Sequence, residues 1–139
     1  VLNQCERCVL LTIYPWWAPN TPDPDNIAAN MRWSYDNGMK QAEAAGLEVI
    51  IGELGWPSEG NPAKKTSIVN EFINYGATCK WIQGNNPPIN KRYVTFWFEM
   101  FDEPWKTQEG PQGPYWGLYT SGKTPQPKQA IPTCEATGT

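Results

Sequence analysis

The chain has 139 residues, a net charge of −3 at neutral pH and a sequence pI near 4.9. Its lysines and arginines are scattered without forming a basic stripe, which argues against a nucleic-acid or anionic-membrane partner. No apolar run reaches the roughly 18 residues that a membrane span requires. With 8 Trp, 6 Tyr, 14 Pro and 12 Gly, it should form at most one globular, loop-rich domain, and a neutral partner such as a sugar polymer fits it best. The sequence begins with neither an initiator methionine nor a signal peptide, so we expect the gene product to start elsewhere.

The first predicted element is an apolar strand over residues 8–14, which runs directly into a cluster of aromatic side chains. Tyr14, Trp16 and Trp17 stand at its carboxyl end, followed by Pro19. Aromatic rings in such a place can offer apolar faces to sugar rings, although adjacent aromatics are also common in protein cores. We take Tyr14 and Trp16 as candidates for stacking against or bordering a substrate.

A helix and a second strand follow. Asp25 or Asn26 can cap the first turn of the helix, which is predicted to run to about Ala45 and to end at Gly46. The strand over 47–51 is a nearly continuous apolar run, typical of a strand buried on both faces of a parallel sheet. Strand, helix and strand then form one βαβ unit, whose connection we expect to be right-handed.

This second strand ends in the segment Gly-Glu-Leu-Gly-Trp-Pro-Ser, residues 52–58. Glu53 is placed at the carboxyl end of the strand, where a charged group is costly unless it has partners or a function. Gly55, Trp56 and Pro57 force a turn that carries a large flat ring, so Trp56 is a third candidate for contact with a substrate. The alternative is that Glu53 is an ordinary surface residue.

A second helix is predicted to begin at Asn-Pro, with Pro62 in its first turn, and to continue to about Ile82. A loop over 84–88 leads to a third strand over 93–98. The segment that follows, Glu-Met-Phe-Asp-Glu-Pro-Trp-Lys at 99–106, places three acids and a base within eight residues. It is either a solvated acidic loop or part of a site.

Several of these segments together resemble glycoside hydrolase family 17, the β-1,3-glucanases and β-1,3-glucanosyltransferases. Residues 52–58 are similar to the nucleophile motif of that family. Residues 100–106, followed by Tyr-Trp-Gly-Leu-Tyr at 115–119, are similar to its eighth-strand region in the fungal and bacterial branch. Tyr-Pro followed by an aromatic, at 14–16, is similar to its sixth strand.

The resemblance implies an α/β chain that is the C-terminal part, about strands six to eight, of a (β/α)8 TIM barrel. Residues 1–46 would hold strand and helix six, 47–90 strand and helix seven, and 91–139 strand eight with a C-terminal coil. The stretch from Glu109 onward, rich in Gly, Pro, Thr and Lys, is expected to close over the bottom of the barrel.

The same resemblance implies a retaining glycoside hydrolase that acts on β-1,3-glucan with Glu53 as its nucleophile. The family's acid/base glutamate lies on the fourth strand and has no counterpart here, so we expect the isolated chain to be inactive. Glu103 and Lys106 match residues that support the site electrostatically and contribute to substrate binding, and neither a metal nor another cofactor is implied. The alternatives are a β-1,3-glucanosyltransferase, and a non-catalytic fragment that binds glucan or serves a structural role.

The partners implied are therefore a β-glucan polysaccharide or oligosaccharide and whatever completes the barrel. That second partner is the missing N-terminal half, from the same or another chain, or copies of this chain that associate through strand edges. No nucleic acid and no membrane span is expected.

The four cysteines are Cys5, Cys8, Cys79 and Cys134, which permit three pairings. The chain has no histidine, which disfavours a zinc site, and no thioredoxin-like context supports a redox dithiol. We expect structural disulfides in a secreted protein, extracellular or of the cell wall, with free buried thiols as the alternative. In the barrel framework a bridge from Cys79 to Cys5 or Cys8 is favoured, because all three map to the face opposite the active site; Cys134 can reach the same face.

Overall fold

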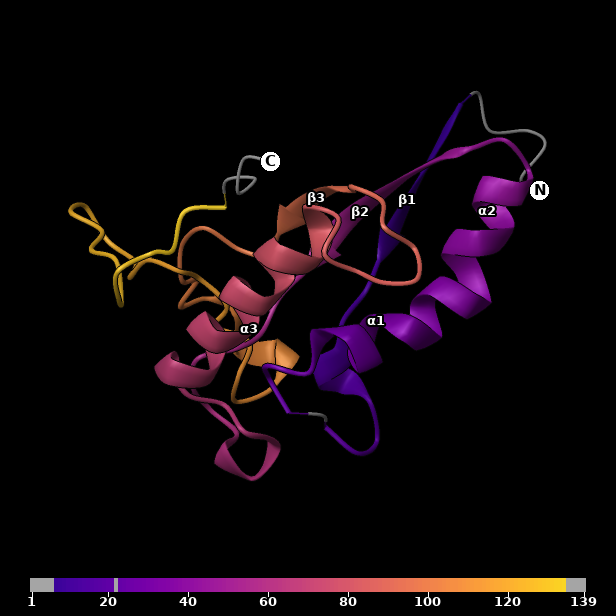
Figure 1. Ribbon diagram of the computed structural model, residues 1–139. Coiled ribbons are helices and arrows are strands. Elements are labelled where there is room, and N and C mark those ends of the chain that lie inside the picture. The colour runs from indigo at the N-terminus through magenta and orange to yellow at the C-terminus, as the bar shows by residue number, and fades with distance from the viewer. Residues whose placement is uncertain (1–6, 22, 135–139) are drawn as a thin grey trace.

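A parallel three-stranded sheet forms the centre of the computed structural model, which describes residues 7–21 and 23–134 (Figure 1). Its strands are β1 (Cys8–Thr12), β2 (Glu48–Leu54) and β3 (Val94–Trp97). Strand β2 lies in the middle, so β1 and β3 each have a single strand neighbour in the part of the chain that the structure describes. The predicted α/β class with parallel strands is confirmed.

Strand β2 is longer than its apolar run. Pairing continues past Gly52 through register irregularities on both sides, so that Thr12 pairs with Glu53 and Leu54 with Trp97. The predicted end at residue 51 is therefore wrong by three residues, because a glycine without a side chain does not interrupt a ladder of backbone hydrogen bonds. As a result Glu53 lies inside the strand, next to its last residue, and its backbone is fixed by the sheet.

The first predicted helix is one helical run with a π-helical middle. It consists of α1 (Ile27–Ser34), a π-helical segment (Tyr35–Met39) and α2 (Lys40–Ala44). The side chain of Asn26 accepts a hydrogen bond from the backbone N–H of Ala29 at 3.4 Å, as expected of a cap. Gly46 follows with a φ of +79°, a left-handed conformation that favours glycine, and the chain turns into β2.

The second helix begins later than predicted. Pro62 belongs to a separate 3-10 turn (Pro62–Lys64), and α3 spans Ile68–Ile82. Lys65, with a φ of 59°, is left-handed and separates the two. Ser67 then caps α3, because its hydroxyl accepts a hydrogen bond from the N–H of Asn70 at 3.0 Å. The proline started a turn that does not continue into the helix.

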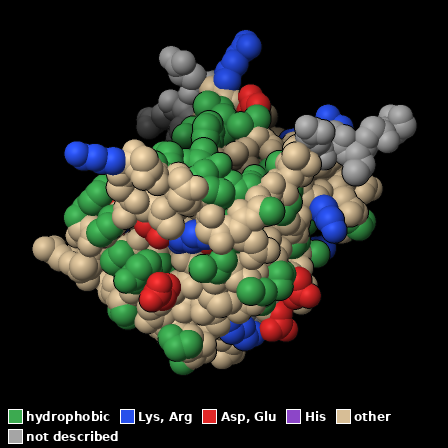
Figure 2. Space-filling view, turned by 90° about the vertical axis from the view of Figure 1, so that its left-hand side faces the viewer, with side chains coloured by type: hydrophobic (Ala, Val, Ile, Leu, Met, Phe, Trp, Pro, Cys, Tyr) green, Lys and Arg blue, Asp and Glu red, His purple; other side chains and the backbone are tan. Residues whose placement is uncertain are grey.

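Helices α1, α2 and α3 lie on the same side of the sheet, and the main core lies between the two layers (Figure 1). The buried core residues include Met31, Met39, Val49, Ile51, Leu54 and Trp81. The opposite face of the sheet has no covering layer among the described residues. Leu10, Val94 and Phe96 alternate out of the strands there and are 62%, 54% and 58% exposed. A space-filling view, turned by 90° from that of Figure 1, shows hydrophobic side chains gathered in its upper part (Figure 2).

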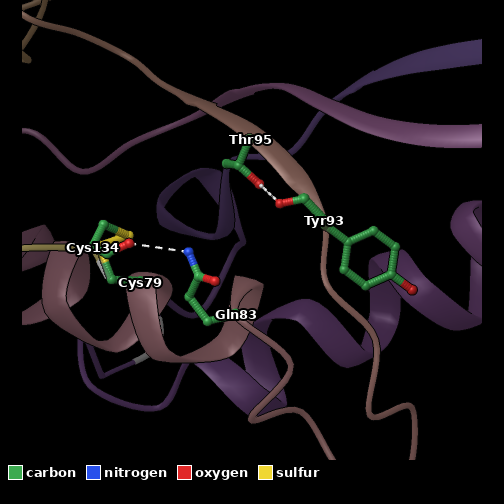
Figure 3. Close-up of a disulfide and its surroundings, with 5 residues drawn as sticks. All are labelled: Cys79, Gln83, Tyr93, Thr95 and Cys134. Atoms are coloured by element: carbon green, nitrogen blue, oxygen red, sulfur yellow. Dashed lines mark hydrogen bonds between the residues drawn. A yellow bond between two sulfur atoms is a disulfide. The ribbon is translucent and has the colours of Figure 1, made fainter. Parts of the chain in front are cut away.

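The disulfide joins Cys79 in α3 to Cys134 in the C-terminal tail, with Cα atoms 5.1 Å apart (Figure 3). The favoured bridge from Cys79 to Cys5 or Cys8 is therefore wrong: Cys8 is free and exposed, and Cys5 lies outside the described residues. The reason is the order of the sheet, because α3 leads into β3 whereas Cys8 begins β1 at the opposite edge. The tail reaches Cys79 instead, and Gln83 Nε2 donates a hydrogen bond to the carbonyl oxygen of Cys134 at 3.0 Å (Figure 3).

Beyond a 3-10 turn at Lys106–Glu109, the described part of the chain forms coil, as predicted. The expectation that this stretch closes over the bottom of the barrel is wrong for its first part, which lies at the carboxyl ends of the strands: the carbonyl oxygens of Tyr115 and Trp116 accept hydrogen bonds from the N–H groups of Ser58 and Glu99. Tyr119 pairs with Phe101 in the loop after β3, and only afterwards does the chain reach α3 at Cys134. None of the described helices combines the length and the apolar character needed to cross a bilayer.

Candidate active site

Glu53 and Tyr14 meet at the carboxyl ends of the first two strands. Glu53 is exposed, and the backbone N–H of Ile13 donates to its carbonyl oxygen at 2.9 Å. The phenolic hydroxyl of Tyr14 donates to Glu53 Oε2 at 3.0 Å. Desolvation of the half-buried ring, followed by this hydrogen bond, raises the pKa of Tyr14, so the phenol remains a donor at physiological pH. One oxygen of the carboxylate is held, and the other has no hydrogen-bond donor among the residues that the structure describes.

A buried aromatic cluster lies behind this pair. It contains Trp16 and Trp56, both 0% exposed, and Trp116, which is 3% exposed. The indole N–H of Trp16 donates to the carbonyl of Lys64 at 2.8 Å, and that of Trp56 to the carbonyl of Lys65 at 3.2 Å. Neither ring therefore presents a face to a sugar in this structure, and their direct contribution to the site is to hold the turns around it.

The exposed member of the aromatic group is Trp17, which sequence reasoning had set aside in favour of Trp16. Its ring is 51% exposed and lies stacked over Trp116, with centroids 6.4 Å apart and planes tilted by 26°. Two adjacent tryptophans cannot be told apart by composition alone. The 3-10 turn at Pro15–Trp17 decides which of them points inward.

Three charged side chains gather at the end of β3. Lys106 Nζ lies 3.2 Å from Glu99 Oε2 and forms a second ion pair with Glu103. Desolvation, supplemented by a hydrogen bond with Glu103, raises the pKa of Glu99 to about 7. The hydrogen bond to Lys106 lowers the pKa of Glu103, whereas burial lowers the pKa of Lys106 but its bonds to both glutamates outweigh that effect and raise it. At neutral pH, Glu103 and Lys106 are charged and Glu99 is part protonated.

The two groups of polar residues are linked through one ring. Phe98 lies edge-on to Tyr14, with centroids 5.9 Å apart, and Lys106 Nζ lies 4.4 Å from the Phe98 centroid. The structure thus brings Tyr14, Glu53, Glu103 and Lys106 together at the end of the sheet where the strands have their carboxyl ends. Glu99 was missed as a site residue, although its position as the first acid after the third apolar run was the same signal that marked Glu53.

Chemically, this end of the sheet offers one exposed, hydrogen-bonded carboxylate, a phenol donor and an ammonium group shared by two glutamates. Such a carboxylate can act as a nucleophile toward a neutral electrophile. A glycosidic bond would also require a proton donor on its leaving oxygen, in retaining enzymes about 5 to 5.5 Å from the nucleophile. Glu99 and Glu103 are both engaged with Lys106, so neither is set apart for that task.

Comparison with known proteins gives a consistent result. The sequence profile of glycosyl hydrolases family 17 matches residues 30–128. A glucan endo-1,3-beta-glucosidase of Emericella nidulans, btgC, is 32% identical over 120 residues, which cover 77% of this chain and 18% of that protein. A glucan endo-1,3-beta-glucosidase of Vitis vinifera is 31% identical over 85 residues, 61% of this chain and 24% of that one. The chain thus spans about a fifth of the length of these relatives.

Solved structures agree with the fold. The family 17 β-1,3-glucanosyltransferase from Rhizomucor miehei superimposes with a TM-score of 0.66 at 27% identity, over 91% of this chain and 42% of that chain. CJP38, a β-1,3-glucanase and allergen of Cryptomeria japonica pollen, gives a TM-score of 0.67 at 17% identity, over 89% and 45%. The second likeness concerns the fold alone. In both alignments this chain corresponds to less than half of a larger protein.

Proposed function

The chain belongs to glycoside hydrolase family 17, and from that premise we propose that it carries the nucleophile side of a retaining β-1,3-glucan hydrolase site. The observation that carries the proposal is the position of Glu53. It is an exposed carboxylate at the carboxyl end of the middle strand, and a phenol donor holds one of its oxygens at 3.0 Å.

In the reaction, the free carboxylate oxygen of Glu53 attacks the anomeric carbon of a β-1,3-linked glucosyl unit. The bond between that carbon and the leaving oxygen breaks, and an acid outside residues 7–134 gives the leaving oxygen its proton. The resulting ester between Glu53 and the sugar is then cleaved by water, which restores the carboxylate. Tyr14 orients the nucleophile throughout, because its hydroxyl occupies Oε2 and leaves Oε1 to react.

The charged residues at the end of β3, Glu99, Glu103 and Lys106, determine the net charge of the site beside this nucleophile. Lys106 neutralises Glu103, and the remaining carboxyl, Glu99, carries a proton for part of the time at neutral pH. The site therefore keeps a small net charge, which suits a neutral sugar. Among the aromatic residues, Tyr14 and the exposed Trp17 border the substrate, and the buried Trp16 and Trp56 support them.

We assign β1, β2 and β3 to strands six, seven and eight of a (β/α)8 barrel, within segments 1–46, 47–90 and 91–139. Two open strand edges and an uncovered apolar face support an arrangement in which five further strands, from the same or another chain, complete the barrel. The acid/base glutamate would enter with them. The Cys79–Cys134 disulfide supports a secreted protein, extracellular or of the cell wall.

A glucanosyltransferase is the second candidate, because the first half of its reaction is the same and a sugar hydroxyl replaces water in the second. The 27% identity to the Rhizomucor miehei β-1,3-glucanosyltransferase supports this candidate, although the hydrolase from Emericella nidulans is 32% identical. A glucan-binding fragment without turnover is the third. Product analysis on laminarin separates them: short sugars indicate hydrolysis, products longer than the donor indicate transfer, and retention without products indicates binding alone.

The nucleophile is tested by covalent trapping in the natural polypeptide that carries these residues. A fluorinated laminaribiosyl donor should label wild type, and peptide mass mapping should place the sugar on Glu53. Glu53→Gln should show no adduct, whereas the matched control Glu48→Gln, an exposed glutamate at the start of the same strand, should be labelled like wild type. An adduct that persists on Glu53→Gln would overturn the assignment.

A further inference from the structure

A buried lysine in the tail lies against the two loops that follow the site strands. The side chain of Lys128 is 6% exposed, although it stands in a coil segment. Its Nζ donates to Asp102 Oδ1 at 2.7 Å and to Ser58 Oγ at 2.6 Å. Glu71 Oε2, in the first turn of α3, lies 3.8 Å away. One ammonium therefore contacts three segments that are far apart in the sequence.

Each hydrogen-bonded partner belongs to a loop that leads out of the site. Ser58 follows β2 five residues after Glu53, and its hydroxyl donates to the carbonyl of Tyr115 at 3.0 Å. Asp102 immediately precedes Glu103, and it accepts a second hydrogen bond from the N–H of Gly117 at 3.0 Å. A change at Lys128 would thus reach the loop after β2 and the loop after β3 together.

Lys128, Asp102, Ser58 and Glu71 form a cluster with three ionisable side chains, of which two carry a charge at neutral pH. Desolvation raises the pKa of Glu71 to about 9 against the opposing effect of Lys128, so this carboxyl is protonated at neutral pH. The ionised pair is then Lys128 with Asp102, whose side chains are 6% and 13% exposed. Removal of one member of such a pair leaves the other as an uncompensated buried charge, which is strongly unfavourable.

We propose that Lys128 is a positioning residue of the active site, which holds the loops after β2 and β3 in the arrangement that aligns Glu53 with Glu103 and Lys106. The inference rests on the proposed function. It follows from geometry: Asp102 and Glu103 are consecutive, so a displacement of one carries the other. Displacement of a reacting group by about 1 Å is enough to cost around a hundredfold in rate.

The test compares Lys128→Met and Asp102→Asn with the control Lys123→Met, an exposed lysine of the same tail. In the natural polypeptide, Lys128→Met should lower kcat on laminarin oligosaccharides at least about tenfold with little change in KM. Lys128→Met combined with Asp102→Asn should recover part of that loss, because no unpaired charge remains. Lys123→Met should behave like wild type.

Hydrogen exchange provides a readout that does not depend on turnover. Lys128→Met should speed exchange in residues 55–60 and 99–106 and leave β2 unchanged. An equal increase in exchange rate throughout the chain, or faster exchange in the two loops with an unaltered kcat, would overturn the positioning role. If Lys128→Met does not fold, Asp102→Asn decides by the same two criteria. A wild-type polypeptide without turnover would instead refute the proposed function, and the exchange data would still decide whether Lys128 holds the loops.

Discussion

At the scale of single residues, the site depends on which charges the fold pairs and which it leaves free. Glu53 keeps a free oxygen because its only side-chain hydrogen bond in the described structure comes from Tyr14. Glu99 and Glu103 both contact the ammonium of Lys106, but they differ in protonation: Glu103 is ionised, whereas Glu99 retains its proton to about pH 7. Two glutamates four positions apart thus differ in protonation, because burial raises the pKa of Glu99 whereas the hydrogen bond to Lys106 lowers that of Glu103.

The protonation of Glu99 can be measured directly. Its pKa of about 7 arises from burial and the bond with Glu103, opposed by Lys106, so Lys106→Met should move the titration midpoint of Glu99 upward. Carbon-detected NMR of the glutamate carboxyls gives that midpoint, and Glu99→Gln identifies the signal. Lys123→Met should leave it unchanged. A Glu99 midpoint near the ordinary 4.5, or one that falls in Lys106→Met, would contradict the assigned contacts.

The same shift has a consequence for folding. The unfolded chain loses the proton of Glu99 near the ordinary pKa of 4.5, whereas the folded chain holds it to about 7. The folded state therefore binds more protons between these values, and this residue's contribution to stability falls as the pH rises through that window. In the natural polypeptide, Glu99→Gln should remove that slope from the pH dependence of the free energy of unfolding, measured in urea.

At the scale of elements, the Cys79–Cys134 disulfide ties the coil tail to α3. The bridge joins residues 55 positions apart, and the chain-entropy model gives a stabilisation of roughly 4 kcal/mol for a loop of that size. In the natural polypeptide, Cys79→Ser should therefore lower the free energy of unfolding by up to that amount, measured by urea denaturation under oxidising conditions. Cys8→Ser, at a free and exposed thiol, should have little effect. Equal losses in both variants would show that Cys8 takes part in the bridge.

The elements also show how far sequence reasoning reached. Three parallel strands, a capped first helix and the placement of Glu53 followed from local patterns, because apolar runs and caps act within a few residues. The start of α3 did not, since Pro62 and Ser67 are both good helix-start signals and only the left-handed Lys65 between them selects the second. The disulfide partner did not either, because the number and spacing of four cysteines do not select one of their three possible pairings.

The site shows the same division. Glu103 and Lys106 were assigned from a segment that could be compared with a family, and the structure brings them together as an ion pair. Burial of Trp16 and Trp56 could not be read from the sequence, because it depends on which side of a turn each ring takes. Lys128 was beyond reach as well: it looks like any lysine in a coil until the tail is placed against Ser58 and Asp102.

At the scale of the whole molecule, the exposed apolar face of the sheet determines whether the isolated chain stays monomeric. Helices cover the other face, whereas Leu10, Val94 and Phe96 are each more than half exposed. Strands β1 and β3 also present edges that lack a strand neighbour among the described residues. Exposed apolar surface next to an open strand edge favours association with further strands. The isolated chain should therefore not persist as a soluble folded monomer.

Size-exclusion chromatography with light scattering measures this. The 139-residue chain, of 15.7 kDa, should elute as a larger species or be lost as aggregate. Replacement of Leu10 and Phe96 by lysine should shift it toward the monomer, because charges on that face oppose association. The matched control replaces Trp33 and Val69, which are 72% and 59% exposed but belong to helices α1 and α3, and should not shift it. A single sharp peak near 15.7 kDa with cooperative unfolding, from the unmodified chain, would show that the three strands need no others, and the assignment to one part of a larger barrel would lose its physical basis.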